Sequence, residues 1–156
     1  MERQNIIIVG EANVGKKTFI KRVMGYKFDD EYNETSVDYN EVLTPWGFYI
    51  LKYRNIKNLK KHIEENNEIL KKYKLFSIML DYTNLKSFNN LKKYIILTKQ
   101  IKNINKIILL INKYENQTKS KYIDKFIYPF MSYKRKRYNI EEIRITSKYY
   151  KGLSLF

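Results

Sequence analysis

The chain has 156 residues, of which 44% are hydrophobic, and this is enough apolar material for one core, so we expect a single α/β domain over residues 1–156. It contains no cysteine, which excludes disulfides, zinc–thiolate sites and lipid anchors attached through cysteine. The net charge is +15, but the lysines are spread along the whole chain, which predicts solvated basic faces. No apolar run approaches membrane-spanning length. We therefore expect an intracellular protein of the cytoplasm or nucleus, with no membrane anchor.

The first predicted elements are a strand, a tight loop and a helix. Ile6–Val9 is a run of β-branched residues typical of a buried strand, and Lys16–Met24 places its apolar side chains on one helical face. Residues 10–16 follow the pattern Gly-x-x-x-x-Gly-Lys, in which backbone N–H groups and a lysine cradle phosphates. The full phosphate-loop pattern continues with Ser or Thr, but here that position is Lys17, and Thr18 comes one place late.

The remainder of the chain alternates predicted strands with predicted helices. A hairpin joins Val37–Thr44 to Phe48–Tyr53 through a Pro-Trp-Gly turn. The further strands are Leu75–Leu80, Lys106–Ile111 and Ile143–Ile145, and the helices span Ile56–Tyr73, Phe88–Ile101 and Lys119–Ile127. This alternation predicts a doubly wound, mainly parallel sheet in which the hairpin adds one antiparallel edge strand.

Polar residues follow the predicted strands at their carboxyl ends, the edge where such sheets bind ligands. These segments are Gly10–Lys17, Asp81, Asn112–Glu115 and Thr146–Lys148. For Asp81, the position at a strand end favours a loop or helix cap over a catalyst. We therefore expect a ligand site to be built from these segments.

Taken in order, the motifs resemble those of small GTPases of the Ras superfamily, and most closely the Ran subfamily, over nearly the whole chain. Gly10–Lys16 resembles the phosphate loop, and Thr18–Arg22 resembles the Ran form of the helix that follows. The Asn-Lys-Tyr-Glu segment Asn112–Glu115 is similar to the guanine-recognition motif N-K-x-D. Ile145–Lys148 is similar to the later S-A-K loop. The resemblance implies a P-loop small-GTPase fold.

The resemblance also implies that the chain binds GTP and GDP. Phe28 matches the aromatic residue that lies against guanine, and Thr35, with the Asp-Glu-Tyr of residues 30–32, resembles switch I. The same resemblance implies catalytic roles for Lys16 and Thr35, and a metal-ligating role for Thr35. The implied nucleotide-binding residues are Gly10, Asn13, Val14, Gly15, Lys16, Lys17, Thr18, Phe28, Asn112, Lys113, Glu115, Thr146, Ser147 and Lys148.

On the base side of this site, each residue of the guanine motif has an implied task. Asn112 and Lys113 pin the loops and cover the guanine ring. The Glu115 carboxylate accepts hydrogen bonds from the two N–H donors on the base edge, although it is one methylene longer than the aspartate of the family.

The chain departs from the family at several positions where the chemistry takes place, among them Lys17 and Leu59. Lys17 occupies the place of the hydroxyl that ligates Mg²⁺, which argues against a bound Mg²⁺, and we hypothesise that Lys17 takes the place of the metal and neutralises phosphate. Leu59 stands in place of the glutamine that orients the attacking water, and a leucine cannot form the hydrogen bonds for that task.

Three functions remain open from the sequence. The first is a Ran-like guanine-nucleotide-binding protein that acts as a slow or locked switch, with impaired or absent GTP hydrolysis. Its protein partners would be regulators or transport factors of the Ran type. The second is a pseudo-GTPase interaction module that no longer binds nucleotide. The third, a basic nucleic-acid binder, is least favoured because the lysines are not interleaved with aromatic residues in one patch. We also expect the last helix of the family to be missing, because the S-A-K-like loop comes so close to Phe156.

Overall fold

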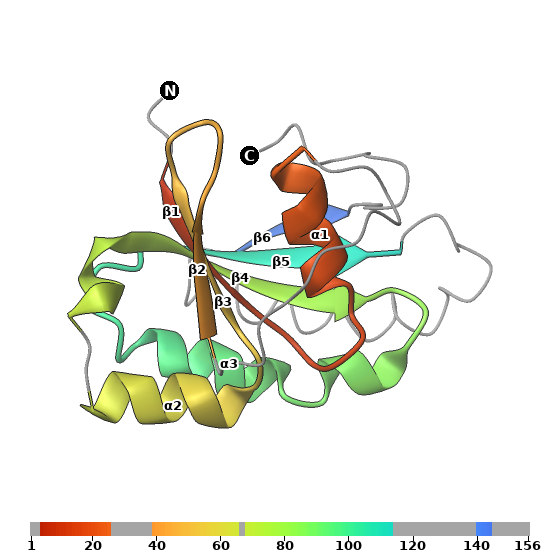
Figure 1. The fold of residues 1–156 in the computed structure, drawn as a ribbon. Helices are drawn as coiled ribbons and strands as arrows, with labels where there is room; N and C mark the ends of the chain where they lie inside the picture. The colour runs from red at the N-terminus through yellow and green to blue at the C-terminus, as the bar shows by residue number, and fades with distance from the viewer. Residues whose placement is uncertain (1–3, 26–38, 66–67, 114–139, 145–156) are drawn as a thin grey trace.

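Among the residues that the structure describes, six strands form one sheet in the order β2-β3-β1-β4-β5-β6 (Figure 1). This computed structural model describes residues 4–25, 39–65, 68–113 and 140–144. The strands are β1 (Asn5–Val9), β2 (Tyr39–Leu43), β3 (Tyr49–Tyr53), β4 (Tyr73–Asp81), β5 (Lys106–Asn112) and β6 (Ile140–Arg144). The helices within these ranges are α1 (Lys16–Val23), α2 (Ile56–Glu65) and α3 (Leu91–Thr98), with 3₁₀ turns over Ile69–Lys72 and Leu85–Phe88.

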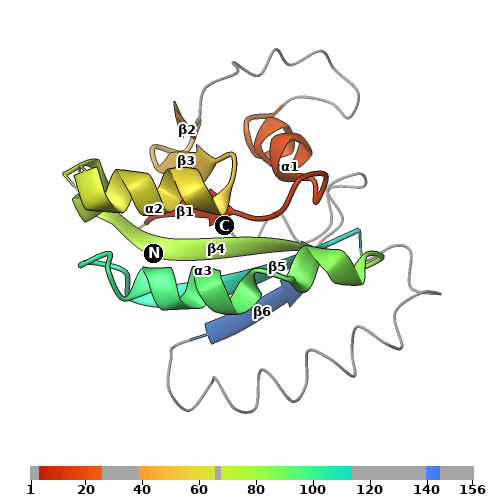
Figure 2. The same ribbon diagram turned by 90° about the horizontal axis from the view of Figure 1, so that it is seen from below.

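The described strands are mainly parallel. Every pair of neighbours in the sheet is parallel except β2 and β3, which form an antiparallel hairpin at one edge. The mainly parallel sheet with one antiparallel edge strand, predicted from the sequence, is thereby confirmed. Helix α1 covers one face, whereas α2 and α3 cover the other (Figure 2). This α/β arrangement is compatible with a doubly wound fold. No helix in the described ranges combines the length and the apolar character that crossing a membrane requires.

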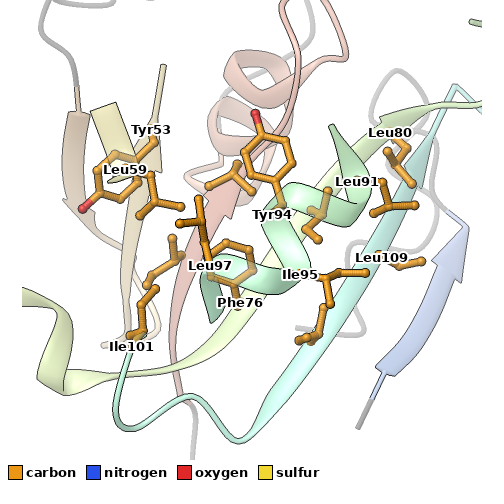
Figure 3. Close-up of a cluster of buried hydrophobic side chains, with 14 of the residues drawn as sticks. Tyr53, Leu59, Phe76, Leu80, Leu91, Tyr94, Ile95, Leu97, Ile101 and Leu109 are labelled. Atoms are coloured by element: carbon orange, nitrogen blue, oxygen red, sulfur yellow. The ribbon is translucent and has the colours of Figure 1, made fainter. Parts of the chain in front are cut away.

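The sheet has an apolar core on each face, because its central strands carry apolar side chains on both sides. On the face covered by α2 and α3, Phe76 and Leu80 of β4 pack in one cluster with Ile95 of α3 (Figure 3). On the opposite face, Met79 of β4 packs with Phe19 of α1. Helix α1, which follows the loop after β1, is therefore anchored directly on the sheet.

The second predicted helix is shorter in the structure. It was expected over Ile56–Tyr73, but α2 ends at Glu65, and Tyr73 begins β4 instead. The spacing was misleading because Leu70 and Tyr73 are buried in the same core as α2, although a 3₁₀ turn and a strand carry them. Tertiary packing here produced a helix-like apolar spacing without a helix.

The later elements also differ from the predicted ranges. In place of the helix predicted over Phe88–Ile101, the structure has the 3₁₀ turn Leu85–Phe88 followed by the shorter α3. The strand predicted over Ile143–Ile145 begins earlier, at Ile140, because pairing with β5 starts there. The helix predicted over Lys119–Ile127 lies outside the described residues.

Helix α2 packs on the sheet through Leu59 and Ile63. Leu59 is 0% exposed and belongs to the core between the sheet and its covering helices. The resemblance places Leu59 at the position of the water-orienting glutamine. In this structure, the position therefore serves packing.

We expect Leu59→Gln to destabilise the fold without supplying a water-orienting amide. The substitution places an amide in an apolar core, where a polar group without a partner costs about 1–3 kcal/mol. Urea denaturation measures the loss in the free energy of unfolding. Leu59→Met is the matched control, because it nearly keeps the volume and should cost less than about 1.5 kcal/mol. Equal stability of Leu59→Gln and the wild-type protein would contradict the burial of this position.

Candidate functional site

The loop after β1 lies at the carboxyl ends of the parallel strands and turns directly into α1 (Figure 2). Its two glycines are needed because neighbouring groups leave no room for a side chain. A Cβ on Gly10 would lie 2.6 Å from the Met79 carbonyl oxygen of β4, and a Cβ on Gly15 would lie 2.2 Å from Asn112 Nδ2 of β5. Gly15 also has a φ of +102°, which favours glycine. The loop is thus held close against β4 and β5.

Asn112 and Lys113, at the end of β5, hold this loop, and Asp81, at the end of β4, pairs with Lys113. We call Asp81, Asn112 and Lys113 the loop clasp. Asn112 is 3% exposed, and its Nδ2 donates to the Val14 carbonyl oxygen at 3.0 Å. Lys113 Nζ donates to the Asn13 carbonyl oxygen at 2.9 Å and pairs with Asp81 Oδ2 at 2.9 Å. The clasp therefore joins the segment after β5 to the loop after β1.

Asp81 ends β4 and organises the turn that follows. Its Oδ1 accepts hydrogen bonds from the backbone N and the hydroxyl group of Thr83, at 2.8 and 2.7 Å. The loop-capping role predicted for Asp81 is therefore confirmed. Its other oxygen pairs with Lys113, a contact that the sequence did not indicate, so Asp81 also positions the loop clasp.

Lys16 is the first residue of α1, and its side chain folds back into the loop. Its Nζ donates to the carbonyl oxygens of Gly10 and Glu11, at 2.5 and 3.0 Å. The pKa of Lys16 is lowered to about 8, mainly by burial and also by the positive charge of Lys52, while the negative charge of Glu11 partly opposes the shift. An anion entering the loop would meet this ammonium group together with the N–H groups at the start of α1.

Lys52 brings a further positive charge to the same edge from β3. The pKa of Lys52 is lowered to about 8, mainly by burial and also by the positive charges of Lys17 and Arg54. Because Lys52 in turn lowers the pKa of Lys16, the three lysines 16, 17 and 52 interact electrostatically. We call Lys16, Lys17 and Lys52 the cation group.

The described residues around the loop do not fit a divalent cation. Within the described ranges, no group of three or more His, Cys, Asp or Glu side chains could hold a metal ion. Mg²⁺ prefers oxygen ligands, whereas the residue after Lys16 is Lys17, an exposed lysine. Thr18, one position later in α1, is rotated by roughly 100° about the helix axis. Thr35, the residue to which the resemblance assigns metal ligation, lies outside the described residues.

The structure gathers the described part of the predicted nucleotide site around one loop. The residues brought together are Gly10, Asn13, Val14, Gly15, Lys16, Lys17, Thr18, Asn112 and Lys113. The predicted residues outside the described ranges are Phe28, Thr35, Glu115, Thr146, Ser147 and Lys148.

Sequence reasoning missed Lys52, although a signal for it was present. Side chains alternate between the two faces of a strand, so Lys52 faces the same way as Ile50, two positions earlier in β3. Ile50 is 0% exposed in the core beneath α1. A lysine at an inward-facing position of a strand is therefore the feature that could have identified Lys52.

The chain matches no protein-family model and no curated protein. Function is therefore inferred from the loop, the loop clasp and the cation group, together with the motifs that the sequence carries.

We expect Gly15→Ala to disrupt the loop clasp and to lower the free energy of unfolding by about 2–4 kcal/mol. The new Cβ would meet Asn112 Nδ2 at 2.2 Å in addition to the strain of a positive φ. Gly25→Ala is the matched control, because Gly25 has a φ of +93° but nothing within 4 Å of its Cβ, so that variant carries backbone strain alone, about 1–2 kcal/mol. Equal losses in urea denaturation would contradict the contact with Asn112.

We expect the free energy of unfolding to rise between about pH 7.5 and 9.5, by about 2 kcal/mol for each of two lysines. Lys16 and Lys52 lose their protons near pH 8 in the folded chain but near 10.5 in the unfolded chain, so the unfolded state binds more protons across this window. Urea denaturation at both pH values measures the rise. Lys52→Met should remove the share of Lys52 and also reduce the share of Lys16, whose pKa Lys52 lowers, whereas Lys93→Met, at an exposed site on α3, should change neither.

Above about pH 10 the trend should reverse. Burial raises the pKa values of Tyr53 and Tyr73, so these hydroxyl groups stay protonated in the folded chain while they ionise in the unfolded chain. A flat profile between about pH 7.5 and 9.5 would contradict the lowered lysine pKa values.

Proposed function

We propose that this protein is a guanine-nucleotide-binding protein of the Ras-superfamily small-GTPase type, most similar to the Ran subfamily, and that it acts as a slow or locked switch. The loop clasp is the observation that carries this proposal. Two motifs of the resemblance contact each other there, since Asn112 and Lys113 bond to the carbonyl groups of Val14 and Asn13, 98 and 100 residues away in the chain.

Such a clasp suits a nucleotide because it ties a base-binding segment to a phosphate-binding loop. Lys113 has a φ of +61°, which is uncommon for a residue other than glycine and often marks a functional segment. Two residues later in the sequence, Glu115 is the proposed acceptor for the N–H groups of guanine.

The phosphates of the nucleotide are proposed to lie along the loop at the start of α1. There, backbone N–H groups and the positive end of the helix dipole favour an anion. The Lys16 ammonium group now bonds to the neutral carbonyl groups of Gly10 and Glu11. Contact with a phosphate oxygen would be stronger, because both partners are then charged.

Hydrolysis of GTP is proposed to be impaired or absent. The position of the water-orienting glutamine is Leu59, whose side chain lies in the core. The described residues also fail to fit Mg²⁺. Bound GTP would therefore persist, and release of the switch would depend on slow nucleotide exchange or on a protein partner, such as a regulator or transport factor of the Ran type.

The altered metal and catalytic positions, Lys17 and Leu59, also favour a second function. The protein would then be an interaction module that keeps the fold and has lost the nucleotide. In that case Lys16 would keep its bonds to the loop carbonyl groups, and the loop clasp would serve the fold alone.

We expect isothermal titration calorimetry to detect binding of GTP and GDP, but not of ATP, because the proposed contacts of Glu115 require the guanine edge. Lys16→Met should weaken binding by about tenfold or more through loss of a charge-assisted hydrogen bond. Lys93→Met, which removes an equal charge from the exposed surface of α3, should leave binding unchanged.

Incubation of the complex with GTP, followed by chromatography of the bound nucleotide, tests hydrolysis. We expect GTP to remain largely intact. Rapid formation of GDP would overturn the locked switch. No heat of binding for either nucleotide, with Mg²⁺ or with EDTA, would favour the interaction module instead.

A further inference from the structure

Lys52 lies at a position of β3 whose side chain faces α1. In the parallel register of β1 and β3, Lys52 pairs with Ile8, just as Ile50 pairs with Ile6. Residues paired in this way share a face of the sheet. Ile6, Ile8 and Ile50 all belong to the core beneath α1. The Lys52 side chain therefore continues this row, one step closer to the carboxyl ends of the strands and to the loop.

A lysine in this row has an energetic cost in the folded chain. Lys52 is 8% exposed, and the removal of a charged group from water is unfavourable. The positive charges of Lys17 and Arg54 add repulsion, and Lys16, also 8% exposed, lies within electrostatic range. A polyanion between these groups would relieve the repulsion, and its oxygen atoms would accept charge-assisted hydrogen bonds from the ammonium groups.

The strand order gives the candidate site a direction. Asn112, at the start of the base-recognition motif, is the last residue of β5. From β5 the sheet continues through β4 and β1 to β3 (Figure 2). The loop after β1 leads to Lys16, and β3 carries Lys52. A nucleotide with its base at the β5 end would extend its phosphates toward β3. Lys52 lies on the far side of Lys16 in this direction, where the terminal phosphate would be.

We propose that Lys52 is a phosphate-binding residue, and that Lys16, Lys17 and Lys52 together bind the terminal phosphate of a guanine nucleotide without a divalent cation. This inference rests on the nucleotide-binding function proposed above. Three ammonium groups supply the positive charge that a metal would otherwise bring, and they repel a metal. GTP is bound more tightly than GDP, because GDP lacks the phosphate that lies beside Lys52.

Calorimetric titration with GTP and with GDP tests the inference, using wild-type protein, Lys52→Met, Lys52→Arg and the control Lys93→Met, each with Mg²⁺ and with EDTA. For the wild-type protein we expect GTP affinities that agree within about twofold in the two conditions. Lys52→Met should lose about tenfold or more in affinity for GTP, and less for GDP. Lys52→Arg should retain most of the affinity, and Lys93→Met all of it.

Thermal unfolding of Lys52→Met verifies that the variant is folded, and we expect it to be at least as stable as the wild-type protein at pH 7.5. If folded Lys52→Met binds GTP as Lys93→Met does, Lys52 is not a phosphate ligand, and the nucleotide-binding function stands. Wild-type binding that requires Mg²⁺ would likewise overturn only the metal-independent site. If the wild-type protein binds neither nucleotide, the proposed function fails together with this inference.

Discussion

The candidate site depends on one buried hydrogen bond, from the Asn112 amide to the Val14 carbonyl oxygen. Asn112 is 3% exposed at the end of β5, where an amide without a partner would be costly. Gly15 must lack a Cβ for this approach, and Lys113, the next residue, reaches Asn13 from the same strand end. The bond thereby fixes the loop after β1 relative to β5, although β4 lies between these two strands in the sheet.

Positive charge at the same edge is the second constraint on the site. The lowered pKa values of Lys16 and Lys52 mean that their protonated forms cost free energy in the folded state. Perturbed groups of this kind gather where a protein binds ligands or performs chemistry. Glu11 contributes an acid from the loop, and its carboxylate accepts a hydrogen bond from Asn90 at 2.6 Å. A polyphosphate is the ligand class that suits an edge with this arrangement.

Local patterns were sufficient to predict the strand, loop and helix that begin the fold. The bounds of β1 and α1 fall within one residue of those expected, because a β-branched run and a glycine pattern act over short distances. The end of α2 at Glu65 could not be predicted, because the helical spacing of apolar residues continues as far as Tyr73. Tyr73 belongs to a strand only because it pairs with Asn5 of β1, which the spacing does not reveal. The alternation within β3 could have marked Lys52 as inward-facing, but its proximity to the loop follows from the register of β1 and β3, which no local pattern contains.

Two departures from the small-GTPase pattern, Lys17 and Leu59, lie away from the β5 side of the candidate site. On the β5 side, Asn112 and Lys113 keep their contacts with the loop. On the side of α1 and β3 stand Lys17 and Lys52, while Leu59 lies in the core. Undirected loss of a nucleotide site would affect both sides and gives no reason for a costly lysine at an inward-facing strand position. The proposed lysine-assisted phosphate binding would account for the loop clasp and the cation group together. The proposed loss of hydrolysis would follow from the same arrangement, because Leu59 lacks the amide with which the resembled enzymes position water for attack.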